Sequence, residues 1–591
     1  MQPFISSFGY NCIKVTWEIS MYKKNVIKSG LFLILILTGC SASSGRKDKN
    51  ITESLEIASD SGMVVSAHPQ GSAIGVQILK NGGNAIDAAV ATEFALAVCY
   101  PKAGNLGGGG FMVIRTSEGK TDVIDFREKA PSLASRDMFL DKSGAVLEGL
   151  STDSPLSSGV PGTVDGMIRA HLMYGKLPFK DIIQPAIDLA EKGFMVAREQ
   201  ADDLNSTKLQ FTERNLSRPA FVKDSLWKEG DILLQKDLAE TLKRIRDYGR
   251  DGFYSGKTAR LIIKEMKRGR GIISEEDLKA YNSVSRLALS TTYKGFKIIT
   301  VPPPSSGGIL LVQLLAMIEP FPVSEWGLNS VRTIHLITEA EKRAFADRAE
   351  YLGDPDFMKI NSNKLLNRKY LLGRMSDFDE NNATPSQKVK AGSPEGYTSE
   401  ETTHFSVVDA DGNAVSVTTT LNGTFGNCIV VDSAGFLLNN QMDDFSVKPG
   451  FPNMYGLVGG EANSVQPGKK MLSSMTPAIV EKNGKLFMVL GSPGGSTIPT
   501  SVFQVIINVI DFGMNIQDAV DAGRFHHQWL PDWISYEKKA VDSISLLNLT
   551  KMGHTLTMRS SIGRVNAILV LPDGKKTGGA DKRGNNSTCG Y

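Results

Sequence analysis

The feature that most constrains this chain is the stretch 402–422, TTHFSVVDADGNAVSVTTTLN, which follows a segment of very different composition. Residues 376–401 are rich in Ser, Pro, Gly, Asn and Glu, which predicts a mobile and exposed strip. From Thr402 onward, apolar and polar residues alternate on both sides of a Gly-containing turn, which predicts two strands joined as a hairpin. A turn symmetric about Asp411 places Thr402 opposite Thr420. A flexible strip that ends at a hydroxyl residue on a rigid strand is what a self-cleaving precursor needs.

The N-terminal residues 1–39 have the character of an export leader. A basic stretch from Met21 to Lys28 precedes the short apolar run 31–37, which is too short to span a membrane comfortably. The sequence LTGC ending at Cys40 resembles a bacterial lipobox, which predicts acyl chains on Cys40 and a polar stalk over residues 40–60. A plain cleaved signal with an incidental cysteine is the alternative, and Met21 is an alternative start. We therefore expect an exported, periplasmic protein that touches the membrane only through a lipid anchor.

Charge and cysteine content exclude several classes of protein. The formal net charge of +3 comes from the leader, where four lysines oppose Glu18, so the remaining chain is neutral and gives no reason to expect a nucleic-acid partner. Beyond Cys40 the cysteines are Cys99, Cys428 and Cys589, too few and too scattered for a disulfide framework. Neither CxxC nor HExxH occurs, and we expect no metal and no cofactor.

Periodicity along the chain indicates a mixed α/β protein, built as two domains or as one large layered fold. Residues 66–98 and most of 160–290 read as helices, and 334–351 as a helix with a partly exposed charged face. Strands are expected at 121–126, 298–301, 478–481 and 486–490, with a buried helix at 309–318.

Several segments allow both a structural and a functional interpretation. The glycine run 104–110 is not a phosphate loop, because it lacks the Lys-Ser/Thr pair, and it allows either a buried backbone crossing or a ligand contact. Arg127 at a strand end is either a surface ion-pair residue or a clamp for a carboxylate. The loop 449–460 is either an inert connection or a lid. Two glycines in the segment 491–495 could aim backbone N–H groups at an oxyanion. His526 and His527 are adjacent, so we interpret them as hydrogen-bonded structure.

Nine sequence blocks together resemble the gamma-glutamyltranspeptidases (glutathione hydrolases), a family of the N-terminal nucleophile hydrolase superfamily. The resemblance runs from about Met63 to Tyr591. The blocks are GNLGGGGFM, DFREKAP, DRAEYLGDPDF, TTHFSVVDADGNAVSVT, NNQMDDF, PNMYGLVGG, LSSMTP, GSPGGS and RFHHQWLP.

The resemblance implies an αββα sandwich, made as one precursor in which Thr402 attacks the carbonyl of Glu401. The products would be a large subunit, 40–401, and a small subunit, 402–591, intertwined in one fold. Chemistry supports this order of events, since a threonine hydroxyl is a poor nucleophile until a neighbouring base activates it. Cleavage frees the α-amino group of Thr402, which supplies that base.

The resemblance also implies roles for individual residues. Thr402 would be the nucleophile, Thr420 would hydrogen-bond to it, and Gly494 and Gly495 would donate to the oxyanion. The residues implied to bind substrate are Arg127, Ser473 and Ser474 at its α-carboxylate, Asn422, Gln441 and Asp444 at its α-ammonium, and Tyr455 on a lid over the pocket.

The implied activity is transfer of the γ-glutamyl group of glutathione and related amides to water or to an amino acid or peptide acceptor. One alternative is a cephalosporin or glutaryl acylase of the same fold, whose acyl group lacks the ammonium, so the presence of Asp444 favours the glutamyl substrate. A second alternative is an inactive surface-binding lipoprotein. The presence of every expected catalytic residue argues against it.

Overall fold

The computed structural model describes residues 57–360, 362–390 and 402–591, and two seven-stranded sheets form its centre. The first sheet has the strand order β19 (Ser587–Gly590), β2 (Met63–Ser66), β10 (Thr403–Val408), β11 (Ala414–Thr420), β3 (Gly109–Arg115), β4 (Thr121–Asp125) and β7 (Val284–Arg286). The second has the order β1 (Ala58–Ser59), β18 (Lys576–Ala580), β17 (Asn566–Val570), β13 (Lys485–Gly491), β12 (Ala478–Lys482), β9 (Phe296–Thr300) and β8 (Leu289–Tyr293).

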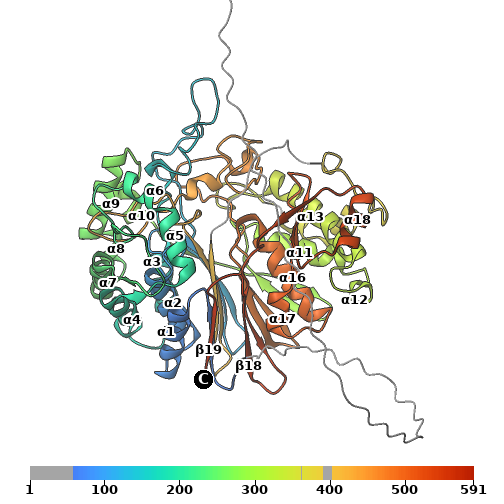
Figure 1. The fold of residues 1–591 in the computed structure, drawn as a ribbon, viewed down its shortest axis with the longest axis horizontal. Helices are drawn as coiled ribbons and strands as arrows, with labels where there is room; N and C mark the ends of the chain where they lie inside the picture. The colour runs from blue at the N-terminus through green and yellow to red at the C-terminus, as the bar shows by residue number, and fades with distance from the viewer. Residues whose placement is uncertain (1–56, 361, 391–401) are drawn as a thin grey trace, which may run out of the picture. The chain divides into compact units, whose positions relative to one another are not determined.

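Helices cover the outer face of each sheet (Figure 1). Over the first sheet lie α1 (Pro69–Lys80), α2 (Ala85–Cys99), α3 (Thr163–Tyr174), α4 (Phe179–Lys192), α5 (Arg198–Ser206), α6 (Lys208–Arg214), α7 (Lys236–Tyr248), α8 (Asp251–Tyr254), α9 (Gly256–Gly269) and α10 (Glu275–Ala280). On the side of the second sheet lie α11 (Gly307–Ile318), α12 (Val323–Trp326), α13 (Val331–Tyr351), α14 (Ser362–Leu365), α15 (Arg368–Arg374), α16 (Ile498–Ile510), α17 (Ile516–Asp521) and α18 (Ser543–Lys551).

Smaller elements complete the description. They are the strands β5 (Phe194–Met195), β6 (Ile232–Leu233), β14 (Phe525–His526), β15 (Ile534–Glu537) and β16 (Leu556–Arg559), and the 3-10 turns η1 (Pro155–Ser157), η2 (Gln441–Asp444), η3 (Glu461–Asn463) and η4 (Gly495–Thr497).

Three apolar cores hold the layers together. Phe405 and Val407 of β10 pack into the core beneath the first helical layer, because alternate strand residues point to opposite faces. Phe111 of β3 and Ile479 of β12 meet in a core between the two sheets. A third core joins the second sheet to α11, α13 and α16. This helix-sheet-sheet-helix order confirms the αββα sandwich.

The predicted hairpin is β10 and β11, and it lies in the middle of the first sheet between β2 and β3. Phe405 pairs with Val417 and Thr403 with Thr419, so the register is symmetric about Asp411 as predicted. Gly412 has a φ of +86°, which a turn of this kind favours in glycine. The hairpin therefore brings Thr402 and Thr420 together at its open end.

The glycine run 104–110 is a place where backbones cross at close range. A Cβ atom on Gly108 would lie 2.0 Å from the Thr420 carbonyl oxygen, and one on Gly110 would lie 2.2 Å from that of Thr418. These contacts support the interpretation as a buried backbone crossing, and the run leads directly into β3 as expected.

Three expectations hold for only part of their residues. Most charged residues of α13 are buried, because neighbouring segments cover the helix from Thr333 to Ala349, and ion pairs such as Glu339 with Arg343 (2.7 Å) compensate the charges. The charged residues near its ends, Arg332 and Glu350, are exposed. Most of the described part of the strip, 376–390, is exposed as expected, but Ser386 and Val389 are buried, and the Trp529 indole N–H donates to the Ser386 carbonyl at 2.9 Å. Ala58 and Ser59, expected in the stalk, form strand β1 against β18.

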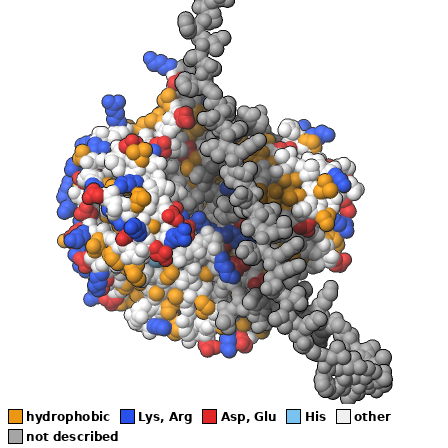
Figure 2. All heavy atoms as spheres, viewed as in Figure 1, with side chains coloured by type: hydrophobic (Ala, Val, Ile, Leu, Met, Phe, Trp, Pro, Cys, Tyr) orange, Lys and Arg blue, Asp and Glu red, His pale blue; other side chains and the backbone are white. Residues whose placement is uncertain are grey.

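Other expectations lie outside the described residues, including the leader, Cys40 and Glu401. Within the described ranges, no helix is both long enough and apolar enough to cross a membrane. Acidic and basic side chains are interspersed on the face shown in Figure 2, in keeping with the neutral charge of the chain beyond its leader.

Candidate active site

Thr402 and Thr420 meet at the open end of the hairpin. Their hydroxyl oxygens lie 3.4 Å apart, and both side chains are nearly buried. The Asn422 N–H donates to the Thr420 hydroxyl at 2.8 Å, which fixes the position of that oxygen. The sequence-derived symmetry thus predicted a contact that the structure contains.

Gly494 and Gly495 lie between β13 and α16, next to Thr402. Their φ angles are +133° and +51°, which side chains rarely adopt, so the turn depends on glycine. Among the hydrogen bonds of the described residues, neither glycine N–H has an acceptor. Backbone N–H groups without an acceptor beside a hydroxyl residue are the donors that an oxyanion requires.

A small cavity of about 20 Å³ opens on one side of Thr402. All seven residues expected to bind substrate line it, together with Thr402, Thr420 and Gly495. These seven are Arg127, Asn422, Gln441, Asp444, Tyr455, Ser473 and Ser474. The structure therefore brings together residues that are spread over more than half of the sequence.

The charges that line the small cavity compensate one another. Arg127 is fully buried, which excludes the surface interpretation, and its guanidinium donates to the Asp444 carboxylate at 2.5 Å. Gln441 donates to the same carboxylate at 2.7 Å, and Asn453 donates to the other oxygen of Asp444 at 3.1 Å. A ligand with one anionic and one cationic group can replace this ion pair without leaving either charge unpaired.

Tyr455 lines the small cavity and is held there by several contacts. Its hydroxyl donates to the Asn422 carbonyl at 2.6 Å, and a Cβ atom on Gly495 would lie 2.6 Å from its ring. The loop 449–460 is anchored beneath by Asp443, which accepts from the Met454 N–H at 2.9 Å. The loop 449–460 is therefore held beside the small cavity, and its interpretation as a lid stays a prediction.

Sequence reasoning missed several residues around the small cavity. Arg348 of α13 is buried and donates to the Ser306 hydroxyl at 3.0 Å, and Ser306 in turn donates to the Ser473 carbonyl at 2.6 Å. Burial lowers the pKa of Arg348 to about 10, and the charge of Asp444 opposes this shift. Arg348 lies in the block DRAEYLGDPDF, and its position in a block shared with the family was the one indication in the sequence that it could lie near the site.

Two buried carboxyl groups adjoin the Arg127–Asp444 pair. Burial raises the pKa of Glu128 to about 7 against the opposing charge of Arg127. Burial likewise raises the pKa of Asp443 to about 7, although the Met454 N–H and the Ser151 hydroxyl favour its charged form. Both groups therefore titrate near neutral pH.

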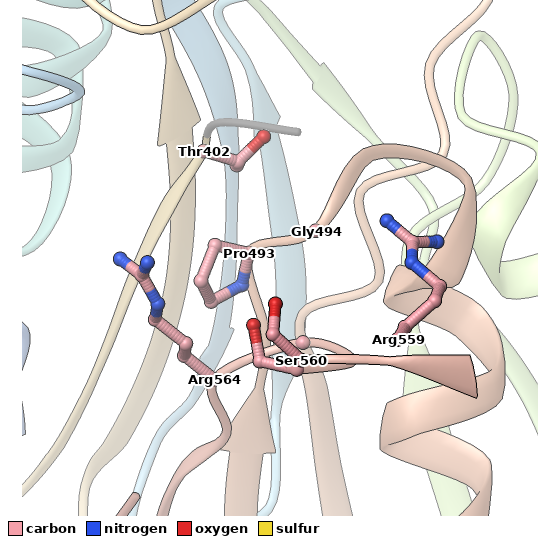
Figure 3. A pocket seen from close by; sticks show the side chains of 8 residues that line it. Thr402, Pro493, Gly494, Arg559, Ser560 and Arg564 are labelled. Atoms are coloured by element: carbon pink, nitrogen blue, oxygen red, sulfur yellow. The ribbon is translucent and has the colours of Figure 1, made fainter. Parts of the chain in front are cut away.

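A large cavity of about 340 Å³ opens on the other side of Thr402 (Figure 3). Its lining residues are Thr402, Pro493, Gly494, Arg559, Ser560, Ser561, Gly563 and Arg564. Thr402 lines both cavities, so the two spaces lie on either side of this residue.

One group of side chains in the described residues could hold a metal ion. The possible ligand atoms of His335, Glu339 and His554 all lie within 4.8 Å of one another. His335 and His554 are hydrogen-bonded at 2.8 Å, and Glu339 is paired with Lys342 and Arg343 at 3.2 and 2.7 Å. The positive charges of Lys342 and Arg343 oppose the binding of a metal cation at this place. This favours a structural role for His335, Glu339 and His554. His526 and His527 are hydrogen-bonded to Thr500 and Asp532, as expected.

A four-layer sandwich with a threonine at the start of a central strand, beside glycine N–H groups without an acceptor, defines an N-terminal nucleophile hydrolase. The model of the family Gamma-glutamyltranspeptidase matches residues 71–591. The chain belongs to this family.

The similarity of this chain to individual proteins agrees with its membership of this family. The chain is 48% identical to the glutathione hydrolase proenzyme of Escherichia coli (strain K12), over 90% of this chain and 92% of that protein. Among solved structures, a cephalosporin acylase from Bacillus halodurans has a TM-score of 0.79 at 25% identity, covering 94% of this chain and 99% of that chain. The Helicobacter pylori gamma-glutamyltranspeptidase has a TM-score of 0.54 at 45% identity, covering 55% of this chain and 94% of that chain.

Proposed function

We propose that this protein removes the γ-glutamyl group from glutathione and other γ-glutamyl amides and passes it to water or to an amino acid or peptide. The observation that carries the proposal is the small cavity beside Thr402, in which a buried Arg127 and Asp444 compensate one another. A γ-glutamyl group carries an α-carboxylate and an α-ammonium on a short stem. The γ-glutamyl group can therefore pair with both charged residues of the cavity. Its carboxylate would be bound by Arg127, Ser473 and Ser474, and its ammonium by Asp444, Asn422 and Gln441.

The reaction proceeds through an ester on Thr402. The α-amino group of Thr402 accepts the hydroxyl proton while the hydroxyl oxygen attacks the γ-carbonyl carbon. Gly494 and Gly495 donate to the oxyanion, the C–N bond breaks, and the amine leaves with the proton. Water or an acceptor amine then attacks the ester, the new nucleophile loses a proton to the same α-amino group, and Thr402 is regenerated.

Self-cleavage between Glu401 and Thr402 must come first, since Thr402 has no free α-amino group in the intact chain. The relative in Escherichia coli is called a proenzyme. The match covers 94% of the solved Helicobacter pylori chain but only 55% of this chain, so that solved chain is much shorter than this one. Both facts support a chain that is divided into a large and a small subunit, 40–401 and 402–591.

The acylase alternative shares the fold, as the similarity to a cephalosporin acylase illustrates. Asp444 distinguishes the two activities, because a glutaryl group has no ammonium to pair with this carboxylate. Loss of a charged hydrogen bond in a buried site typically costs about 10- to 100-fold in binding.

The experiment compares the turnover of a γ-glutamyl anilide with that of the matching glutaryl anilide by purified, processed protein. We expect kcat/KM for the γ-glutamyl compound to be at least ~10-fold higher. A preference for the glutaryl compound rejects the glutamyl activity in favour of the acylase. Absence of turnover with both compounds supports the third candidate, a binding lipoprotein.

We further propose that the protein is exported to the periplasm and anchored by acyl chains on Cys40. The lipobox-like sequence at 37–40 and the polar residues after it support this proposal. Labelled palmitate should enter the wild-type protein and not the Cys40→Ala variant. Equal labelling of both proteins would exclude Cys40 as the lipidated residue.

A further inference from the structure

The block RFHHQWLP at residues 524–531 contains buried polar side chains that none of the roles above uses. One of them, Gln528, follows strand β14, and its side-chain N–H donates to the Tyr455 carbonyl oxygen at 3.2 Å. Tyr455 lines the small cavity, whereas Gln528 lines neither the small nor the large cavity. Gln528 therefore contacts the backbone of a residue of the small cavity from outside that cavity.

The side-chain amide of Gln528 has one orientation that satisfies its neighbours. Its oxygen lies 3.1 Å from Nε2 of His526. Burial lowers the pKa of His526 to about 3, so the ring is neutral at pH 7 and carries a single N–H. Because the Gln528 oxygen can only accept, that hydrogen lies on Nε2, and Nδ1 accepts from the Thr500 hydroxyl 2.9 Å away. The N–H of Gln528 is therefore directed at Tyr455.

The backbone beside Gln528 is anchored to helix α13. The His527 N–H donates at 2.7 Å to the carboxylate of Glu341, which belongs to α13. The Trp529 N–H donates to the His527 ring at 3.0 Å, so both neighbours of Gln528 are hydrogen-bonded. Gln528 is thus held in place independently of the loop 449–460.

The loop 449–460 is the part of the lining of the small cavity that can move at least cost. The structure describes this loop in full, and it contains neither helix nor strand. It contributes Tyr455 and Leu457 to the lining. By contrast, Thr420 and Ile498, which also line the cavity, belong to β11 and α16. Displacing the loop therefore breaks no hydrogen bond of a helix or sheet.

The size of the small cavity requires such a movement. Its volume of about 20 Å³ is room for about one water molecule. A γ-glutamyl group is many times larger, so part of the lining has to move when the group enters. The hydrogen bond from Gln528 to Tyr455 favours the return of the loop to the closed position, which is the position that the structure shows.

We propose that Gln528 is a positioning residue, which holds Tyr455 at the small cavity and thereby raises the affinity of the site for the γ-glutamyl group. The apparent affinity of a ligand scales with the fraction of the protein in the position that binds it. Loss of one neutral hydrogen bond changes such an equilibrium by about 2- to 10-fold. The identity of the ligand rests on the proposed function, whereas the contact between Gln528 and the loop does not.

The first test measures kcat and KM of Gln528→Leu and Gln528→Glu on a γ-glutamyl anilide. Both variants remove the N–H donor, and Gln528→Glu keeps the size of the side chain. We expect KM to rise by about 2- to 10-fold in each variant. Because Gln528 lines neither cavity, kcat should stay within about twofold of wild type.

Gln517→Leu is the matched control for Gln528→Leu. Gln517 on α17 also donates to a backbone carbonyl, that of Ala580, at 3.0 Å, and it lines neither cavity. This variant should keep the kcat and KM of wild type. Its loss of stability in thermal unfolding shows what removal of such a bond costs where no residue of the small cavity is contacted.

The second test measures hydrogen exchange of the backbone amides of 449–460 in purified protein without substrate. Gln528→Glu should speed this exchange by about 2- to 10-fold and leave the exchange of β10 and β11 unchanged. Gln517→Leu should leave the exchange of the loop at the wild-type rate.

An unchanged KM or an unchanged exchange of the loop in Gln528→Glu would overturn the inference. A fall in kcat together with faster exchange throughout the protein would also overturn it, because a merely structural role would have that effect. If the loop exchanges faster as expected but the wild-type protein turns over no γ-glutamyl compound, the proposed function is rejected and the contact between Gln528 and the loop stands.

Discussion

Replacing Gly495 by alanine perturbs the proposed oxyanion site through one added carbon. The new Cβ atom would lie 2.6 and 2.8 Å from two carbons of the Tyr455 ring. Since ordinary contacts of this kind begin near 3.4 Å, the ring or the backbone must move by nearly 1 Å. The ring is held by the bond from the Tyr455 hydroxyl to Asn422, so the glycine N–H has to give way.

The expected loss in kcat is about 10²- to 10³-fold, the usual cost of removing one oxyanion donor. The φ of +51° adds about 1 kcal/mol of backbone strain to the cost in stability. Gly484→Ala is the matched control, because Gly484 has a φ of +74° and nothing within 4 Å of the added carbon. It should lose only the stability that corresponds to the backbone strain and keep its activity.

The assay measures kcat on a γ-glutamyl anilide per processed molecule, with thermal unfolding alongside. Adding Tyr455→Ala to Gly495→Ala removes the ring that the new carbon contacts, so the double variant should be more active than the product of the two single effects predicts. The reasoning is refuted if Gly495→Ala keeps its kcat within about threefold of wild type, or if the two substitutions act independently.

Three other variants test separate parts of the account. Asp444→Asn should raise KM for γ-glutamyl donors by about 10²-fold and leave self-cleavage intact, which kinetics and a denaturing gel will check; unchanged kinetics would remove Asp444 from the site. Thr420→Val removes the hydroxyl 3.4 Å from that of Thr402 and should lower kcat with little change in KM; normal kcat would contradict the proposed hydrogen bond. Burial lowers the pKa of His554 to about 3, so neutral His554 adds stability above pH 6.5 that is lost as pH falls toward 3. This loss is about 3 kcal/mol at pH 4, and His554→Gln should lose correspondingly less stability than wild type between pH 7 and 4 in chemical denaturation; equal losses would contradict the assignment.

The central hairpin was predictable because its signal is local. Strand alternation has a period of two, and a Gly-containing turn fixes the register, so the contact between Thr402 and Thr420 follows from the letters alone. The resemblance to the family then gave seven residues expected to bind substrate, and all seven line the small cavity.

Burial of charge was not predictable, because the partners lie far away in sequence. Arg127 and Asp444 are separated by 317 positions, and no local pattern distinguishes a buried clamp from a surface arginine. Helix α13 has the same difficulty, since Glu339 and Arg343 at a spacing of four residues read as an exposed pair. Segment 376–390 is polar in composition, yet Trp529 binds it through the carbonyls of Ser386 and Val389.

The central claim is that the chain is cleaved before Thr402 and that this residue becomes the nucleophile. Intact mass and N-terminal analysis of the purified protein test it most directly. We predict two polypeptides for wild type, the smaller comprising residues 402–591 with Thr402 at its N-terminus, and a single inactive polypeptide for Thr402→Ala. A single uncleaved wild-type chain with full γ-glutamyl activity, or normal cleavage of the Thr402→Ala variant, would contradict the account.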